Sequence, residues 1–141
     1  MEDLSSFKKF VLIYLAVLVV GVAVAFFYLQ TQRGRFPYGD VSVEEARELI
    51  QQKAELKIVD VRLDTEFNES HIPGAINVCV CDPDNLLRDL SPNDEILLYC
   101  RSGLRSSAAL DFLYEHGYSK MYNMVGGIVA WKNAGYPTIE G

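Results

Sequence analysis

Residues 95–106 read EILLYCRSGLRS, an apolar run that reaches a cysteine and continues into a short polar loop. The length and composition of Glu95–Tyr99 predict a buried strand, which places Cys100 at its carboxyl end. The residues from Ser106 to His116 have a helical pattern that Gly117 stops. Because ligands of open α/β sheets bind at the carboxyl ends of the strands, this stretch predicts both a fold class and the position of a site.

The segments around this stretch alternate between strand and helix patterns. Strands are expected at 57–61, 75–80 and 120–125, and helices at 42–52, from 82 onward and at 127–134, with a polar loop at 62–74. Such alternation implies parallel βαβ units. We therefore expect an α/β fold, with a central, mostly parallel sheet of about five strands flanked by helices.

A block of apolar residues precedes this region. Residues 10–29 contain 19 apolar residues and one glycine, Gly21. A helix of that length reaches roughly 30 Å, the thickness of the hydrocarbon core of a bilayer. We expect a transmembrane signal-anchor at 10–29, between an N-terminal tail at 1–9 and a tether at 30–37, with the folded domain at 38–141. A cleaved signal peptide and a buried core helix are the alternative interpretations.

The basic residues that flank this block bear on the side of the membrane. Lys8 and Lys9 precede the block and Arg33 and Arg35 follow it, so the count of positive charges is a tie. A short tail with two lysines against the apolar run is typical of a signal-anchor. We therefore expect a single-pass membrane protein whose domain lies outside the cytoplasm.

The expected domain is acidic. From Phe36 to Gly141, 17 Asp and Glu residues oppose nine Lys and Arg residues. An acidic surface repels phosphate backbones, which argues against nucleic acid as a partner. A small anionic substrate would have to be captured by a local cluster of donors.

The loop after Cys100 has the composition of such a cluster. A tight turn there directs backbone N–H groups inward, Gly103 permits backbone geometry that other residues avoid, and the next helix adds its N-terminus. Arg101 and Arg105 supply positive charge. A thiol in this setting ionises readily and is a candidate nucleophile, although free cysteines are also common as small core residues.

Several motifs, in the same order, give the sequence a resemblance to a single-domain rhodanese, a sulfurtransferase. They are Ile58–Arg62, Glu66-Phe67, His71–Val78, the Cys100–Arg105 loop, and Gly126–Trp131 with Ala134–Pro137. The resemblance covers roughly residues 38–141 and implies a rhodanese-like fold.

The resemblance also implies a mechanism in which Cys100 is catalytic and carries a persulfide. A sulfane sulfur would pass from a small anionic donor such as thiosulfate to a thiol or cyanide acceptor, without a metal or an organic cofactor. A membrane protein or a thiol-carrying protein is a further expected partner. The expected substrate-binding residues are Arg101, Ser102, Gly103, Leu104 and Arg105.

Loop length separates this chemistry from that of related phosphatases. Dual-specificity phosphatases that resemble rhodanese place five residues between cysteine and arginine, whereas four separate Cys100 from Arg105, and Ser106 stands at the phosphatase position. Phosphatase and arsenate-reductase activities are therefore not expected. A non-catalytic module that binds a partner or an anion, and a thiol-disulfide or persulfide oxidoreductase, remain as alternatives.

The oxidoreductase alternative depends on Cys79 and Cys81. On a strand they would point to opposite faces, so a disulfide between them would be strained. Two ligands are too few for a zinc site. They are either ordinary strand residues or one of them resolves the Cys100 persulfide as a disulfide.

The remaining motif residues are expected to support the fold. Asp60, Arg62 and Glu66 have the charges for an ion-pair network after the first expected strand. His71 is expected to serve the fold rather than to act with Cys100.

Overall fold

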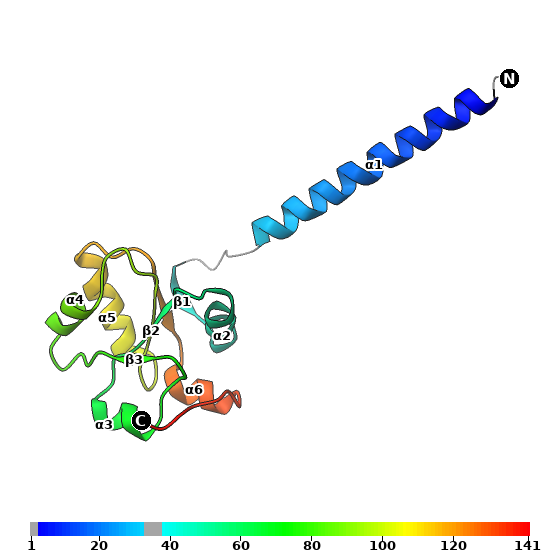
Figure 1. Cartoon of the computed structure of the whole chain (residues 1–141). Helices are drawn as coiled ribbons and strands as arrows, with labels where there is room; N and C mark the ends of the chain where they lie inside the picture. Colours follow the sequence, from blue (N-terminus) through cyan, green and yellow to red (C-terminus); the bar gives the residue numbers. More distant parts are fainter. Residues whose placement is uncertain (1–2, 33–37) are drawn as a thin grey trace. The chain divides into compact units, whose positions relative to one another are not determined.

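A long N-terminal helix and a five-stranded α/β domain make up the part of the chain that the computed structural model describes, residues 3–32 and 38–141 (Figure 1). The helix and the domain are two separate units, and each is described by itself.

The N-terminal helix, α1, spans Asp3–Gln32. Its stretch Phe7–Phe27 is exposed, and it is long and apolar enough to cross a membrane. The helix begins inside the predicted tail and ends inside the predicted tether, because no glycine or proline interrupts the residues on either side of the apolar block. The rest of the predicted tether, residues 33–37, lies outside the described residues.

The domain is built on a parallel sheet. The strand order is β1-β5-β4-β2-β3, and every neighbouring pair is parallel. The predicted fold class is therefore confirmed. The strands are β1 (Gly39–Val41), β2 (Lys57–Asp60), β3 (Ile76–Asn77), β4 (Ile96–Tyr99) and β5 (Met121–Met124).

Five helices surround this sheet: α2 (Val43–Gln52), α3 (Asp64–Glu69), α4 (Asp84–Asp89), α5 (Leu104–Glu115) and α6 (Gly127–Asn133). The α4 and α5 helices bury apolar side chains against one face of the sheet, with Leu86 and Leu113 fully buried. The α2 and α6 helices contact each other on the other face (Figure 1). Apolar layers on both faces explain why all four residues of β4, the middle strand, are buried.

Local signals predicted most of these elements. At α2, the Ser42 side chain accepts a hydrogen bond from the N–H of Glu45, and the Glu45 carboxylate accepts one from the N–H of Ser42. This is the predicted capping box. Two expectations were wrong: α3 replaces part of the loop expected at 62–74, and the strand expected at 75–80 is reduced to the two residues of β3. The strand β1 was not predicted.

Candidate active site

Cys100 follows β4 directly, at the carboxyl edge of the sheet. Its side chain is buried, and it is the one free cysteine in the described part of the chain. The backbone N–H of Gly103 points at its sulfur atom, with the nitrogen 3.1 Å from Sγ. The loop therefore curls around the sulfur and offers it backbone donors, as expected for an anion nest.

Gly103 makes this curl possible. Its φ is +96°, in the left-handed region that favours glycine. A Cβ at this position would lie 3.2 Å from the nitrogen of Gly126 and 3.3 Å from the oxygen of Met124. Both the backbone conformation and the close approach to the β5–α6 connection therefore require glycine here.

A chain of hydrogen bonds links the loop to β5 and β1, from the buried Ser106 and Asn123 to the exposed Asp40. Ser106 Oγ lies 2.6 Å from Asn123 Oδ1 and 3.6 Å from Cys100 Sγ. Asn123 Nδ2 in turn donates to Asp40 Oδ1 at 2.7 Å, which orients the amide with its oxygen toward Ser106. The sequence analysis did not identify Asn123 or Asp40, and no local pattern joins two residues that lie 83 positions apart.

Two opposing effects set the acidity of Cys100. Burial by itself raises the pKa of the thiol, because protein surroundings solvate a thiolate less well than water does. Hydrogen bonds from the Ser106 side chain and from the backbone N–H groups of Ser106, Ser102 and Gly103 lower it. The hydrogen bonds outweigh burial, so the pKa of Cys100 lies below its ordinary value. This is the property that a thiolate nucleophile requires.

The two arginines of the loop differ in their surroundings. Arg105 donates two hydrogen bonds to the Glu66 carboxylate, at 2.9 and 3.0 Å. Glu66 also accepts a hydrogen bond from the backbone N–H of Leu63, so its carboxylate is fixed at the start of α3. Arg101 is exposed and forms no ion pair with any residue in the described ranges. Arg105 also interacts with the Cys100 sulfur, so Arg101 is the loop arginine without a carboxylate partner among the described residues, whereas Arg105 is shared between Glu66 and Cys100.

The remaining loop residues, Ser102 and Leu104, are both exposed. Ser102 contributes its backbone N–H to the sulfur. Leu104 is 78% exposed although it is apolar, because it stands at the first position of α5 and points away from the core. The structure thus gathers backbone groups of the loop around Cys100 and leaves these two side chains in solvent.

The other motif residues hold the loops in place. Arg62 forms a buried ion pair with Asp60 and donates to the carbonyl of Ser70. The predicted network is therefore split, because Glu66 pairs with Arg105 instead.

The His71 ring stacks on Phe67, and its Nδ1 lies 2.9 Å from the Phe67 carbonyl. These contacts serve the fold.

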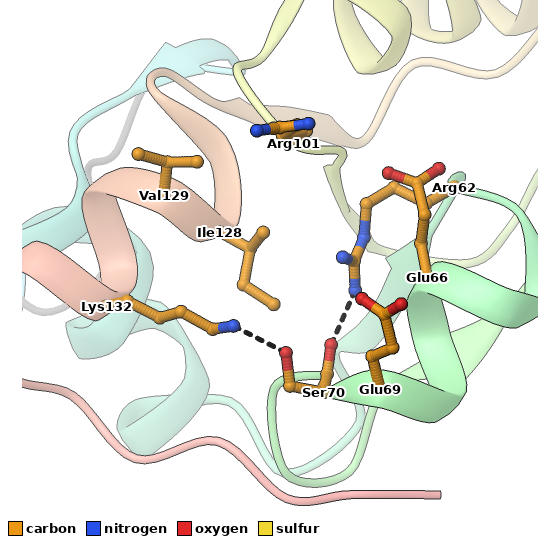
Figure 2. A pocket seen from close by; sticks show the side chains of 8 residues that line it. All are labelled: Arg62, Glu66, Glu69, Ser70, Arg101, Ile128, Val129 and Lys132. Carbon is orange, nitrogen blue, oxygen red and sulfur yellow. Dashed lines mark hydrogen bonds between the residues drawn. The ribbon is translucent and has the colours of Figure 1, made fainter.

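A pocket of about 500 Å³ lies beside the Cys100 loop (Figure 2). We call it the Arg101–Lys132 pocket. Arg62 and Glu66 line its edge, but both are paired elsewhere. Its other lining residues are Glu69 at the end of α3, Ser70 directly after it, Arg101 in the loop, and Ile128, Val129 and Lys132 on α6.

The backbone attaches this pocket to the nucleophile. The N–H of Ile128 donates to the carbonyl of Cys100 at 2.9 Å, and the N–H of Val129 donates to the carbonyl of Arg101 at 3.2 Å. The wall formed by α6 is therefore joined to the loop by backbone hydrogen bonds. The sequence analysis missed the pocket residues Glu69 and Lys132, because exposed charges on helices carry no pattern of their own.

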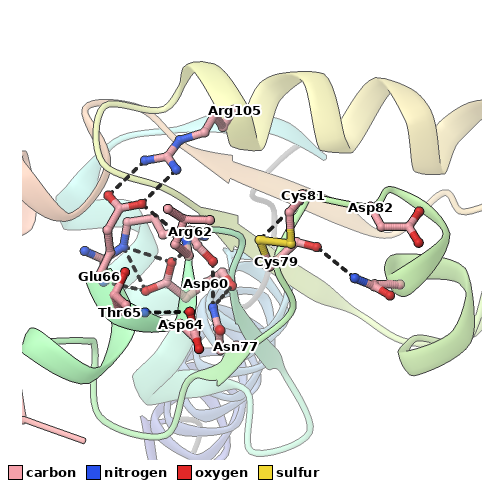
Figure 3. The surroundings of a disulfide bond; sticks show 12 residues. Asp60, Arg62, Asp64, Thr65, Glu66, Asn77, Cys79, Cys81, Asp82 and Arg105 are labelled. Atoms are coloured by element: carbon pink, nitrogen blue, oxygen red, sulfur yellow. Dashed lines mark hydrogen bonds and ion pairs between the residues drawn. A yellow bond between two sulfur atoms is a disulfide. The ribbon is translucent and has the colours of Figure 1, made fainter.

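The other two cysteines form a disulfide with each other (Figure 3). The expectation that Cys79 and Cys81 point to opposite faces of a strand was wrong, because β3 ends at Asn77 and these residues lie in the turn that follows. Alternation along a strand does not apply there. While the disulfide is closed, neither sulfur is available to resolve a persulfide on Cys100.

The charged and sulfur-bearing side chains do not form a metal site in the described ranges. Among residues 3–32 and 38–141, no group of three or more His, Cys, Asp or Glu side chains is arranged to hold a metal ion.

The chain is similar in sequence to proteins named for sulfur transfer or sulfur carriage. The thiosulfate sulfurtransferase GlpE of Coxiella burnetii is 31% identical over 103 residues, which cover 73% of this chain and 94% of that protein. YrkF of Bacillus subtilis, described as a sulfur carrier, is 32% identical over 92 residues. That match covers 65% of this chain and 50% of YrkF, so the chain spans half the length of that relative.

The solved structures give the same result for the fold. A rhodanese-related protein from Thermoplasma volcanium has a TM-score of 0.66 and 26% identity, over 74% of this chain and all (100%) of that one. The rhodanese-like domain of an Anabaena protein has a TM-score of 0.67 and 25% identity, over 72% of this chain and 79% of that one. A family model described as a rhodanese-like domain matches residues 42–134. Two of the relatives compared above, GlpE and YrkF, are named for sulfur transfer and sulfur carriage. The chain therefore belongs to the rhodanese-like family.

Proposed function

We propose that this protein is a sulfurtransferase that moves a sulfane sulfur from a small anionic donor to a thiophilic acceptor through a persulfide on Cys100. The observation that carries the proposal is the position of the Cys100 sulfur. The backbone N–H groups of the loop form a nest that is directed at this sulfur, and the pKa of the thiol lies below its ordinary value. A buried thiol used only for packing needs neither feature.

The first half-reaction forms the persulfide. With thiosulfate as donor, the Cys100 thiolate attacks the outer sulfur, and the bond between the two sulfur atoms of thiosulfate breaks. Sulfite leaves with the electron pair of that bond. The persulfide is held as an anion by the N–H groups of the loop, which are already directed at the sulfur position.

The donor anion needs a cation that is free to bind it. Of the two loop arginines, Arg105 is occupied by Glu66, whereas Arg101 is exposed and has no carboxylate partner in the described ranges. We assign orientation of the donor to Arg101 and to the backbone N–H groups of Ser102 and Gly103. Arg105 has a supporting part, since it fixes the start of α5 against α3.

The test is thiocyanate formation from thiosulfate and cyanide by the full chain purified in detergent. The Cys100→Ser variant is the control, because it removes the nucleophilic sulfur and changes little in volume. We expect turnover by the unchanged protein and none by the variant. Equal rates, or no turnover by either protein, would contradict the proposal and favour a non-catalytic binding module.

We also propose that residues 10–29 anchor the domain to a membrane as a single-pass segment, with the domain outside the cytoplasm. The length and hydropathy of α1 support an anchor. The expected result is that the protein stays in the membrane fraction after alkaline washing and keeps its N-terminal residues. Release of a shortened chain would indicate a cleaved signal peptide. A reporter fused to the carboxyl terminus, active on one side of a membrane, tests the orientation.

A further inference from the structure

Few positive charges in this acidic domain are free of carboxylate partners. Five of its nine Lys and Arg side chains form ion pairs within the described ranges. The other four are Arg47, Arg101, Lys120 and Lys132. Arg47 lies over the ring of Tyr136, and two of the remaining three line the same pocket. This concentrates positive charge at the Arg101–Lys132 pocket.

The pocket also presents one free negative charge. Glu69, at the end of α3, is exposed and has no ion-pair partner among the described residues. Arg101 belongs to the loop and Lys132 belongs to α6. The Lys132 ammonium group donates a hydrogen bond to the Ser70 hydroxyl group, which is a neutral partner (Figure 2). The two signs of charge therefore come from different elements around the same cavity. Such an arrangement suits a ligand that carries both signs.

The size and the apolar side of the pocket restrict that ligand further. A volume of about 500 Å³ lies within the range of about 300–1,000 Å³ that is usual for sites of organic ligands. It exceeds what a small inorganic anion would fill. Ile128 and Val129 add an apolar surface between the charges, which suits the carbon chain of an organic molecule.

We propose that the Arg101–Lys132 pocket binds the sulfur acceptor, and that this acceptor is a thiol of the amino-acid or short-peptide class, with both a carboxylate and an ammonium group. Lys132, with Arg101, receives the carboxylate, and Glu69 receives the ammonium group. This assignment rests on the proposed function, because it identifies the second substrate of the same Cys100 persulfide.

The transfer step balances without an added oxidant or reductant. The acceptor loses its thiol proton to solvent, and its sulfur attacks the outer sulfur of the Cys100 persulfide. The bond between that outer sulfur and Cys100 Sγ breaks, and Cys100 leaves as a thiolate with the electron pair. The acceptor departs as a persulfide, and the loop N–H groups again hold the Cys100 anion.

The test uses four thiols that share a short carbon chain and differ in the polar groups on it, with a neutral hydroxyl group in 2-mercaptoethanol. They are cysteine, 3-mercaptopropionate with the carboxylate alone, cysteamine with the ammonium group alone, and 2-mercaptoethanol with neither. The full chain in detergent is first charged with polysulfide, and loss of the Cys100 persulfide is then followed by mass spectrometry. For each thiol, the rate with the unchanged protein is divided by the rate with a variant, which cancels differences in thiol reactivity.

Two variants address the two signs of charge. We expect Lys132→Gln to slow the reaction of cysteine and 3-mercaptopropionate by roughly 1.5-fold to fivefold, the range set by a single solvent-accessible charge contact. We expect Glu69→Gln to slow cysteine and cysteamine to a similar extent. Neither variant should alter the rate with 2-mercaptoethanol.

Matched controls lie at the other edge of the sheet. Lys120 directly precedes β5 and Glu115 ends α5, so both are remote from the carboxyl edge. Lys120→Gln and Glu115→Gln should leave all four rates unchanged. The same rate ratio for all four thiols in Lys132→Gln or in Glu69→Gln would overturn the acceptor assignment alone. Failure of Cys100 to carry a persulfide at all would overturn the proposed function together with it.

Discussion

The Ser106 hydroxyl group donates a hydrogen bond to the amide oxygen of Asn123 across 2.6 Å, in the buried layer behind the Cys100 loop. A hydroxyl group has a single proton to donate. When that proton is directed at Asn123, no proton lies in the longer contact, of 3.6 Å, between the Ser106 oxygen and the Cys100 sulfur. Asn123, the Gly103 carbonyl at 3.2 Å and the Cys100 thiolate therefore compete for the same donor, and this competition leads to two predictions of opposite sign.

The first prediction concerns Ser106→Ala. Removal of the hydroxyl group takes away one side-chain donor of the Cys100 thiolate and leaves Arg105 beside it, so the pKa of Cys100 should rise from its lowered value. The measurement is the rate of alkylation by iodoacetamide as a function of pH, whose midpoint should move upward. Ser107→Ala, one position along α5, is the control and should leave the midpoint in place. An unchanged midpoint in Ser106→Ala would show that the backbone N–H groups set the acidity alone.

The second prediction concerns Asn123→Ala. Without the amide oxygen, the Ser106 proton is shared only between the Gly103 carbonyl and the sulfur, so the same alkylation midpoint should move downward. The variant should also lose about 1–3 kcal/mol of unfolding free energy, because a buried hydrogen-bonded partner is removed. A shift in the same direction as in Ser106→Ala would contradict the competition between Asn123 and Cys100.

The third prediction concerns Gly127, where α6 begins. Its φ is +58°, and a Cβ there would collide with the backbone of Cys100 and Arg101. Gly127→Ala should therefore destabilise the domain by about 2–4 kcal/mol in denaturant unfolding. Gly135→Ala is a matched control, since φ is also positive there but a Cβ would meet nothing within 4 Å. Gly135→Ala should lower the unfolding free energy only by the cost of the left-handed backbone conformation, about 1–2 kcal/mol. Equal losses in the two variants would mean that contact with the Cys100 loop adds nothing.

The fourth prediction concerns the ion pair of Glu66 and Arg105. Hydrogen bonds from Arg105 hold the pKa of Glu66 below its ordinary value. A carboxylate with a lowered pKa stabilises the fold above its unfolded pKa, about 4.3, and loses that contribution as the pH falls through the folded pKa. Glu66→Gln should therefore weaken the dependence of stability on pH below about pH 5.

The loss at neutral pH should be modest in Glu66→Gln, at most about 1 kcal/mol, because both side chains are partly exposed. Glu69→Gln, on the same helix but without an ion pair in the described ranges, serves as the control. If the unfolding free energy falls below about pH 5 in the same way in both variants, this ion pair is not the source of that fall.

The element pattern of the domain could be predicted because it depends on local signals. The apolar run before Cys100, the capping box at Ser42 and the glycine at Gly117 each act within a few residues. The short helix α3 could not be predicted in this way, because its six residues include no buried side chain and so no apolar periodicity. The strand β1 has only three residues and gains its pairing from β5, far along the chain.

The site was predictable only in part, for the same physical reason. Cys100, Gly103 and the loop donors lie within one turn of the chain, so their meeting follows from the sequence. The partners that set their properties come from elsewhere. Glu66 lies 39 positions from Arg105, and Asp40 lies 83 positions from Asn123. Those contacts follow from strand order and helix packing, which the sequence pattern does not specify.

The most direct measurement is the intact mass of the full chain after it has reacted with thiosulfate and the excess has been removed. If Cys100 carries the transferred sulfur, the protein gains the mass of one sulfur atom, loses it when a thiol is added, and remains unchanged in the Cys100→Ser variant. A chain that gains no sulfur, or a Cys100→Ser variant that gains the same mass, would contradict the account.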